Sequence, residues 1–241
     1  KFKKYEVESS EFNDSREFIH IFPEIYTRLS LKVKKGLSCI FWLSVDNYYF
    51  KKDHFSFFET TKKYYGSLLT ARLPINCMSD YVHIHQSEYS KIHFSKSKAK
   101  QFEIGDYVYY ENIDNLAPED KVKRILYNPA KGLHITKRLI DENKDIEFLA
   151  LEGFNENELN KLMRESLVYI DFGTHPGRDR MPREAVLAGS VLITGLRGSA
   201  GNTVDIPIPY EYKFETDNNF YKRFRELVDD IFASPSMHVQ N

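Results

Sequence analysis

The most chemically loaded stretch of the sequence is DFGTHPGRDRMPRE, residues 171–184. Its arginines Arg178, Arg180 and Arg183 can each bind phosphate oxygens through two parallel hydrogen bonds. A proline two residues before Glu184 is typical of a first helical turn, so we expect Glu184 near a helix N-terminus, where its carboxylate can bind the diol of a ribose. Because crowded charges cost free energy unless they are paired, the segment indicates either a nucleotide site or a structural Arg and Asp network.

A second candidate is YNPAKG, residues 127–132, in which Asn128 and Pro129 end regular structure. Lys131 then stands with Gly132 at the start of the next expected helix. A lysine there adds to the positive end of the helix dipole, a combination that suits a diphosphate. Alone, the motif is weak evidence and favours a solvated lysine on a tight turn.

A third candidate is TGLRGSAGN, residues 194–202, which contains the small residues Gly198, Ser199 and Ala200. Small side chains let the backbone approach a ligand, and consecutive N–H groups can form a nest for an anion. Such a turn is also a common connector. Three anion-compatible loops from one sheet nevertheless make a stronger case than any one of them.

These loops need strands and helices to position them, and apolar β-favouring runs alternate with amphipathic helical stretches along the chain. This pattern predicts βαβ units and parallel sheets. In the first half we expect strands at 17–22, 38–45, 81–87 and 107–113 and helices at 24–35, 55–72 and 88–100. In the second we expect strands at 124–129, 146–152, 168–173 and 191–195 and helices at 131–143, 155–167, 182–189 and 217–233. Ligands of open α/β sheets bind outside the carboxyl ends of the strands, where the three loops fall.

A polar segment without periodicity, residues 112–123, divides the two patterns and predicts a linker. We therefore expect an α/β protein with two Rossmann-like halves, residues 1–115 and 122–241, of which the first is short or incomplete. The formal net charge of -1 argues against nucleic-acid binding through a global basic field, and no apolar run is long enough to span a membrane. Cys39 and Cys77 lack metal-site spacing and read as free thiols of a reducing, cytoplasmic compartment.

The order of elements from residue 125 to 214 resembles the donor-binding domain of GT-B glycosyltransferases. More narrowly, YNPAKG, VYIDFGTHPGRDRMPREAVLAG and DIPIPYEYKF are similar to segments of bacterial glycosyltransferase-like proteins from surface-polysaccharide loci. FPEIYTRL and FWLSVDNYYF extend the resemblance into the first half. The resemblance implies the GT-B fold, with acceptor binding in the first half and nucleotide-sugar binding in the second.

The resemblance also implies roles for individual residues. Lys131 matches the lysine that contacts the donor diphosphate in retaining enzymes, Glu184 matches the glutamate that binds the ribose, and residues 198–200 match the loop beside the phosphates. The rest of the expected donor-binding set is Asn128, Gly132, Arg178, Arg180 and Arg183. The sequence departs from the family pattern at Pro176, where these enzymes carry a second glutamate. That difference puts the catalytic role of a carboxylate there in doubt.

The implied reaction is transfer of a sugar from a nucleotide sugar to a glycan or lipid-linked acceptor. No DxD triplet is present, so we expect neither a metal nor a cofactor. His175, beside Pro176, is a candidate catalytic residue, and Glu24 and Asp46 are candidate general bases from the first half, although such carboxylates are often only caps or solvated charges.

Two other functions remain open: a truncated, non-catalytic GT-B module that binds a nucleotide or glycan, and a two-domain sugar-nucleotide epimerase. The basic run at residues 96–100 reads as a solvated helix face or as a contact for anionic lipid headgroups. We accordingly expect a cytoplasmic protein, with peripheral association at the inner face of the membrane as an option.

Overall fold

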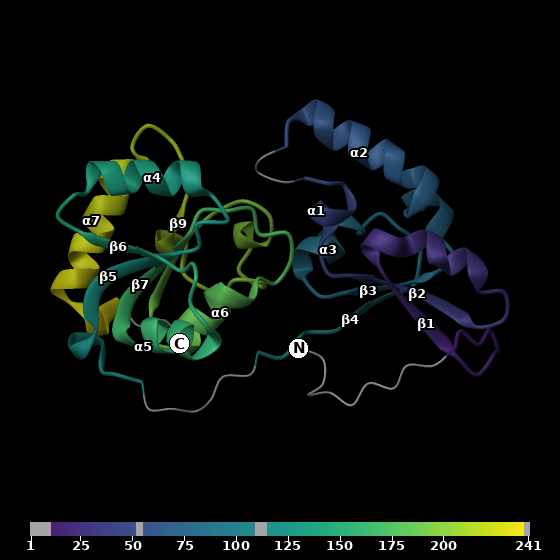
Figure 1. Ribbon diagram of the computed structural model, residues 1–241, viewed down its shortest axis with the longest axis horizontal. Helices are drawn as coiled ribbons and strands as arrows, with labels where there is room; N and C mark the ends of the chain where they lie inside the picture. The colour runs from purple at the N-terminus through teal and green to yellow at the C-terminus, as the bar shows by residue number, and fades with distance from the viewer. Residues whose placement is uncertain (1–10, 52–54, 109–114, 239–241) are drawn as a thin grey trace.

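The computed structural model describes residues 11–51, 55–108 and 115–238, which form two α/β halves (Figure 1). Each half is built on its own parallel sheet and has its own apolar core. The expected α/β class with two Rossmann-like halves is thereby confirmed. The first sheet ends at Glu103 and the second begins at Val122, and the domain limits given above remain a proposal.

The first half carries a sheet in the order β1-β2-β3-β4. Its strands are β1 (Ile19–Pro23), β2 (Leu37–Trp42), β3 (Val82–His85) and β4 (Gln101–Glu103). Its helices are η2 (Glu24–Lys32), α1 (Val45–Tyr48), α2 (Phe57–Thr70), η3 (Ile75–Met78) and α3 (Glu88–His93), where η denotes a 3-10 helix. The fully buried Trp42 stacks on His83 and donates its indole N–H to His83 Nδ1 at 2.8 Å. Aromatic rings therefore supply much of this small core.

The second half carries a sheet in the order β6-β5-β7-β8-β9. Its strands are β5 (Val122–Tyr127), β6 (Glu147–Ala150), β7 (Ser166–Asp171), β8 (Val191–Gly195) and β9 (Lys213–Phe214). Its helical elements are η4 (Pro118–Asp120), α4 (Leu133–Glu142), α5 (Glu156–Glu165), α6 (Arg180–Leu187), η5 (Ser199–Gly201), η6 (Tyr210–Tyr212), α7 (Phe220–Ala233) and η7 (Pro235–His238). The central strand β7 is buried at every position, as expected of a parallel strand covered on both faces.

The edge of the first sheet differs from the sequence-based prediction. The helix expected at 88–100 ends at His93, and β4 follows it instead of a strand at 107–113. The buried ring of Phe94 anchors the helix end, and the His83 N–H then donates to Lys100 O at 2.8 Å, which aligns β4 with β3. Tyr107 and Val108 are not in a strand, and residues 109–113 lie outside the described part of the chain.

The helix expected at 24–35 is the shorter 3-10 element η2, with a break at Tyr26. Thr27, fully buried, accepts the Leu73 N–H at 2.7 Å, which ties this element to the chain after α2. Among the described residues, no helix combines the length and the apolar character needed to cross a bilayer.

Candidate functional site

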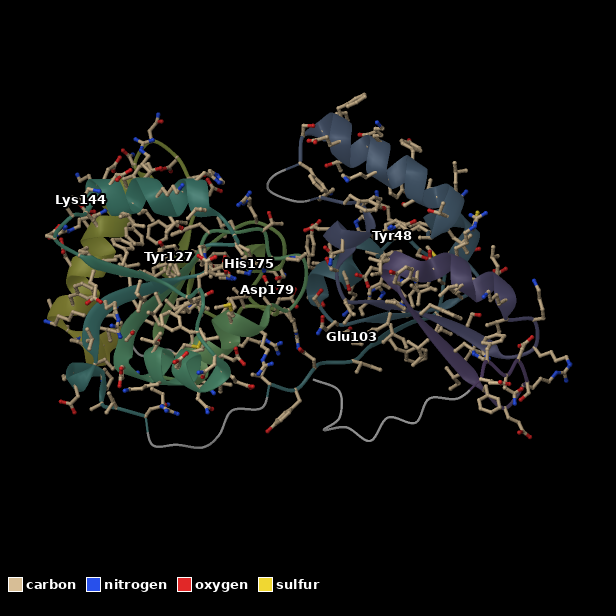
Figure 2. The ribbon with its side chains drawn as sticks, viewed as in Figure 1. Tyr48, Glu103, Tyr127, Lys144, His175 and Asp179 are labelled. Carbon is tan, nitrogen blue, oxygen red and sulfur yellow. The ribbon has the colours of Figure 1, made fainter. Side chains whose placement is uncertain are left out.

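A group of four ionisable side chains lies at the carboxyl ends of β5 and β7. Lys131 Nζ is 2.6 Å from Asp179 Oδ2, and the same carboxylate oxygen is 3.1 Å from His175 Nδ1. On the other side of the ring, His175 Nε2 is 3.5 Å from Asp171 Oδ1. Figure 2 shows His175 and Asp179 on the side of the second half that faces the first half. We call Lys131, Asp171, His175 and Asp179 the charged quartet.

The electrostatics of the charged quartet favour the ionised forms of His175 and Asp179. Burial alone would lower the pKa of His175, but contact with Asp179 and the charge of Asp171 raise it above its ordinary value. Burial alone would raise the pKa of Asp179, but His175 and Lys131 lower it. With both carboxylates ionised, the formal charges of the charged quartet cancel. His175 is 0% exposed, so in this conformation its ring does not reach a substrate.

Backbone packing between two loops places the lysine of the charged quartet. Gly132 has φ +59°, and a Cβ added to it would lie 2.5 Å from the carbonyl carbon of Phe172. The loop after β5 therefore rests directly on the loop after β7, a contact that only glycine permits. This contact explains how Lys131, 48 residues earlier in the chain, reaches Asp179.

The third expected loop, residues 198–200, packs against the loop between β7 and α6, residues 172–179, which we call the charged loop. The Ser199 N–H donates to His175 O at 2.8 Å, and its hydroxyl donates to Gly177 O at 2.6 Å. Gly198 forms a bridge with His175, and Ala200 is fully buried. The expected anion nest is therefore not formed at Ser199, because its N–H is already bound to the neighbouring loop.

The ribose candidate Glu184 is the fifth residue of α6, so it lies beyond the first turn expected for it. Its Oε1 is 2.5 Å from Arg180 Nε, and Arg180 also lies 3.6 Å from Glu156 Oε1 at the start of α5. Asn128 turns toward the same helix, with Nδ2 3.4 Å from Met181 Sδ. Three of the expected donor residues thus lie together near the N-terminal ends of α5 and α6: Asn128, Arg180 and Glu184.

Arg178 and Arg183 each face a different carboxylate, and that of Arg183 belongs to the first half of the protein. Arg183 Nη1 and Nη2 bind the two carboxylate oxygens of Asp106 at 2.9 and 2.6 Å. Arg178 Nε lies 3.4 Å from Asp205 Oδ1. Both guanidinium groups already face carboxylates, so the structure does not bring them to Lys131 as the sequence led us to expect.

The two candidate bases of the first half are buried, and each accepts a hydrogen bond from another residue of that half. Glu24 is 3% exposed and accepts the Leu43 N–H at 3.3 Å, and burial raises its pKa. Asp46 is 2% exposed and accepts the hydroxyl of Tyr89 at 3.1 Å. A Cβ added to Gly177 would lie 2.1 Å from Leu43 O, so the segment that binds Glu24 packs directly against the charged loop.

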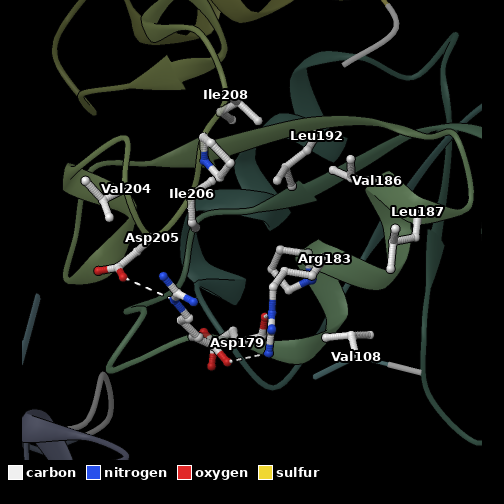
Figure 3. A pocket seen from close by; sticks show the side chains of 13 residues that line it. Val108, Asp179, Arg183, Val186, Leu187, Leu192, Val204, Asp205, Ile206 and Ile208 are labelled. Carbon is white, nitrogen blue, oxygen red and sulfur yellow. Dashed lines mark hydrogen bonds and ion pairs between the residues drawn. The ribbon is translucent and has the colours of Figure 1, made fainter. Parts of the chain in front are cut away.

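Two cavities lie in the second half, and Asp179 of the charged quartet lines the first of them. The one in Figure 3, about 420 Å³, is lined mainly by apolar side chains of α6, β8 and residues 204–208, with Asp179 and Arg183 at one side. The other, about 340 Å³, opens at the carboxyl ends of β8 and β9 and is lined by Phe172, Arg197 and Asp217 among others. The second cavity has the position that ligands take in open α/β sheets.

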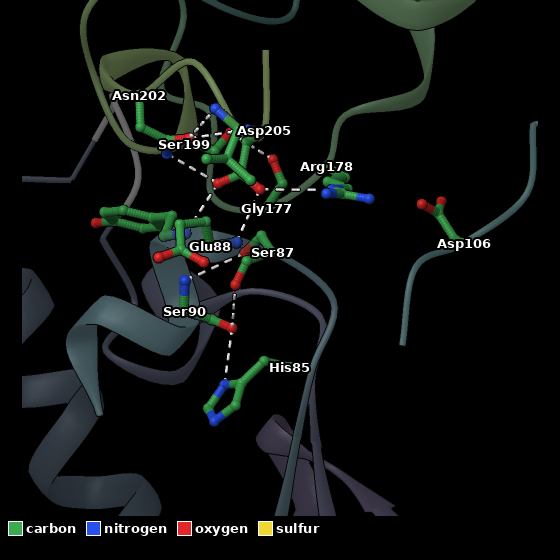
Figure 4. A network of polar contacts seen from close by, with 12 residues as sticks. His85, Ser87, Glu88, Ser90, Asp106, Gly177, Arg178, Ser199, Asn202 and Asp205 are labelled. Carbon is green, nitrogen blue, oxygen red and sulfur yellow. Dashed lines mark hydrogen bonds and ion pairs between the residues drawn. The ribbon is translucent and has the colours of Figure 1, made fainter. Parts of the chain in front are cut away.

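A polar network centred on Asp205, which the sequence did not predict, joins the two halves (Figure 4). Its two carboxylate oxygens accept the N–H groups of Glu88 and Tyr89 at 2.8 Å each, across the boundary between the halves. Asn202 Nδ2 donates to the same carboxylate at 2.9 Å. A local sequence pattern cannot predict these hydrogen bonds, because the donors lie 117 and 116 residues before Asp205 in the chain.

Comparison with known proteins identifies the fold. No family model and no curated protein sequence matches the chain. Among solved structures, S. aureus TarM in complex with fondaparinux, alpha-GlcNAc-glycerol and UDP matches with TM-score 0.62 and 12% identity, over 97% of this chain and 52% of that one. A second TarM structure matches with TM-score 0.59 and 13% identity, over 92% and 50%. Sucrose-phosphate synthase from Thermosynechococcus elongatus matches with TM-score 0.61 and 13% identity, over 88% and 62%.

These likenesses confirm the GT-B fold that the sequence resemblance implied. At such low identity they establish the fold and not the reaction. The chain spans about half the length of the TarM chains it matches.

Proposed function

We propose that this protein is a glycosyltransferase that moves a sugar from a nucleotide-sugar donor to a glycan or lipid-linked acceptor of a bacterial surface polysaccharide, on the cytoplasmic side. The observation that carries the proposal is the position of Lys131 in a GT-B fold. Its ammonium group lies at the carboxyl end of β5, just before α4, and its side chain is 30% exposed. A partly exposed cation at that edge suits the diphosphate of a donor.

The charged quartet supplies a physical route for this binding. In the structure without ligand, Lys131 is paired with Asp179. A diphosphate can take the place of Asp179 on the ammonium group, and the Asp179 carboxylate then keeps His175 as its cationic neighbour. Cleavage of the glycosyl bond leaves negative charge on the departing diphosphate, which Lys131 would stabilise electrostatically.

The nucleoside would lie along the edge between α5 and α6. Glu184 is there to accept hydrogen bonds from a ribose diol, provided that it exchanges Arg180 for the ligand. The side chain of Glu184 is 13% exposed, and that of Arg180 is 59% exposed, so the arginine is free to swing into solvent.

We propose that transfer is independent of metal. Asp171, His175 and Asp179 each offer a ligand atom within 4.8 Å of the others, which is the spacing of a metal site. However, Lys131 already neutralises Asp179, and a divalent cation beside the Lys131 ammonium would be repelled by it. Chelation with EDTA should leave activity unchanged, whereas loss of activity restored by Mg²⁺ or Mn²⁺ would contradict this part.

Thermal unfolding with UDP, GDP, ADP and CMP tests the donor site, because a ligand of the folded state raises the melting temperature with its occupancy. At least one nucleoside diphosphate should stabilise the wild type, and Lys131→Ala and Glu184→Ala should abolish that shift. Lys137→Ala, on the exposed side of α4, is a matched control that should keep it. The donor site is wrong if no nucleotide stabilises the wild type or if both site variants keep the shift.

A non-catalytic GT-B module that binds a nucleotide or glycan is the alternative. Pro176 in place of a family glutamate, and the burial of Glu24 and Asp46, favour it. Hydrolysis of a nucleotide sugar, or transfer to a glycan acceptor, separates the two functions: an enzyme releases the nucleoside diphosphate, whereas a module shows the thermal shift and no release.

A further inference from the structure

The outward side of α2 is an exposed apolar surface that the donor site does not use. Phe58, Tyr65 and Leu69 are 75, 64 and 79% exposed, and we call these three residues the outer α2 face; Phe57, the first residue of the helix, is 87% exposed. Phe58, Tyr65 and Leu69 are spaced by seven and four residues, so they fall on one side of the helix. Figure 1 shows α2 as the outermost element of the first half, away from the sheet.

The charges around the outer α2 face are mainly positive. Lys62 lies on the same side of the helix, between Phe58 and Tyr65, and Lys63 is next to it, both exposed. The only acidic residue of α2 is Glu59, whose carboxylate accepts the N–H and hydroxyl of Ser56 in a capping box at the helix N-terminus. The surface therefore combines aromatic and aliphatic side chains with lysines.

The neighbouring element η2 extends this character. Arg28 donates to Leu68 O at 2.6 Å, which fixes η2 beside the C-terminal part of α2. Tyr26 and Leu29 of η2 are 50 and 44% exposed, and Lys32 at its end is exposed as well. Its one acidic residue, Glu24, is buried.

We propose that the outer α2 face docks on the surface of a lipid bilayer that carries anionic headgroups. Amphipathic helices with aromatic and leucine side chains enter the boundary between headgroups and acyl chains, and lysines add attraction to anionic lipid. The positive charges of Lys62, Lys63 and Lys32 beside the apolar side chains favour an anionic bilayer as the partner of this surface. The inference does not depend on sugar transfer, and it assigns membrane contact to α2 rather than to the basic run at residues 96–100.

Vesicle co-sedimentation of the full chain tests the proposal. The wild type should pellet with vesicles of phosphatidylcholine mixed with phosphatidylglycerol, and less with pure phosphatidylcholine. The triple variant Phe58→Ser, Tyr65→Ser, Leu69→Ser should partition roughly tenfold or more weakly, because three apolar side chains no longer enter the lipid. Lys62→Glu with Lys63→Glu should remove the preference for anionic vesicles.

A double variant, Phe102→Ser with Tyr107→Ser, is the matched control, because these side chains are 58 and 82% exposed in the same half but outside α2. It should bind vesicles like the wild type, and far-ultraviolet circular dichroism should show all variants folded. Failure of the wild type to bind anionic vesicles overturns the proposal, and so does equal binding by the triple variant. The proposal would also be overturned, in favour of contact with a second copy of the chain, if the wild type did not bind vesicles and the triple variant had a smaller oligomeric mass in solution than the wild type.

Discussion

The ammonium group of Lys131 lies 2.6 Å from a carboxylate oxygen of Asp179, and the imidazole of His175 lies 3.1 Å from that same oxygen. One oxygen thus faces two cations that come from different loops. Both contacts join groups of opposite charge when His175 is protonated. Asp179 is therefore the carboxylate that both side chains contact, and it raises the pKa of His175.

The first prediction concerns Asp179→Asn, which should lower the raised pKa of His175. Protonated His175 stabilises the folded chain because its pKa is higher there than in the unfolded chain. This stabilisation is fully present below the unfolded-state pKa of about 6.5, and it is lost as the pH rises through the folded-state pKa. The wild type should therefore lose stability above pH 6.5, and Asp179→Asn should lose less. Urea unfolding across this range measures the difference.

Asp230→Asn is a suitable control for that experiment, because Asp230 pairs with His238 and not with His175. NMR titration of the imidazole gives the pKa of His175 directly. An unchanged His175 pKa in Asp179→Asn would show that the ion pair does not set it.

The second prediction concerns the contact between the loops after β5 and β7. Gly132→Ala should destabilise the fold by about 3 kcal/mol, because alanine meets both an unfavourable φ of +59° and the carbonyl of Phe172. Gly153→Ala shares the positive φ, at +82°, but has nothing within 4 Å, so it should cost only about 1 kcal/mol. Denaturant unfolding measures both.

A third glycine completes the comparison. Gly66 lies inside α2 with nothing within 4 Å of an added Cβ, so Gly66→Ala should stabilise the protein by about 0.5 to 1 kcal/mol. Equal costs for Gly132→Ala and Gly153→Ala would contradict the close packing of the two loops.

Much of this architecture could be predicted from sequence because it follows from local patterns. The run of apolar residues at β7 and the amphipathic stretch at α7 each occur where expected, since burial of one strand or one helix face leaves a periodic signal. β4 is only three residues long and largely exposed, so it leaves no such signal. The aromatic, β-favouring segment from residue 107 therefore predicts an edge strand in its place.

The candidate site was predictable as a set of loops and not as a set of contacts. Composition and spacing drew attention to Lys131 and to the charged loop, but residue types do not say which arginine faces which carboxylate. Arg183 binds Asp106 of the first half, a pairing that depends on how the two halves meet, and Arg178 faces Asp205, which lies 27 residues later in the chain. Long-range geometry of this kind is absent from a local motif.

The third prediction concerns acid stability. Burial, with the charge of His83 second, lowers the pKa of His85 to about 4. Above pH 6.5, His85 is neutral in both the folded and the unfolded chain and does not change the stability. As the pH falls from 6.5 toward 4, the unfolded chain binds a proton at His85 before the folded chain does, so the free energy of unfolding falls. The free energy of unfolding should fall by about 3 kcal/mol between pH 6.5 and 4 because of His85.

Urea unfolding between these pH values tests the assignment, with His85→Gln as the variant that should show a smaller decline. His134→Gln, on the surface helix α4, should decline as the wild type does. Identical declines in wild type and His85→Gln would show that His85 is not the group responsible.

The last prediction concerns the contact between Asp205 and the start of α3. The carboxylate accepts two backbone N–H groups, those of Glu88 and Tyr89, and each hydrogen bond to a charged acceptor contributes about 1.5 to 3 kcal/mol. In Asp205→Ala these amides should exchange with solvent roughly ten to a hundred times faster, because the acceptor from the other half is gone. The Ser90 N–H, bound within the first half to Ser87 Oγ, serves as the internal reference. Amide exchange followed by NMR should show the change at Glu88 and Tyr89 and not at Ser90. A uniform increase at all three would mean that Asp205 supports the whole helix, whereas no increase would mean that the two halves do not hold this contact in solution.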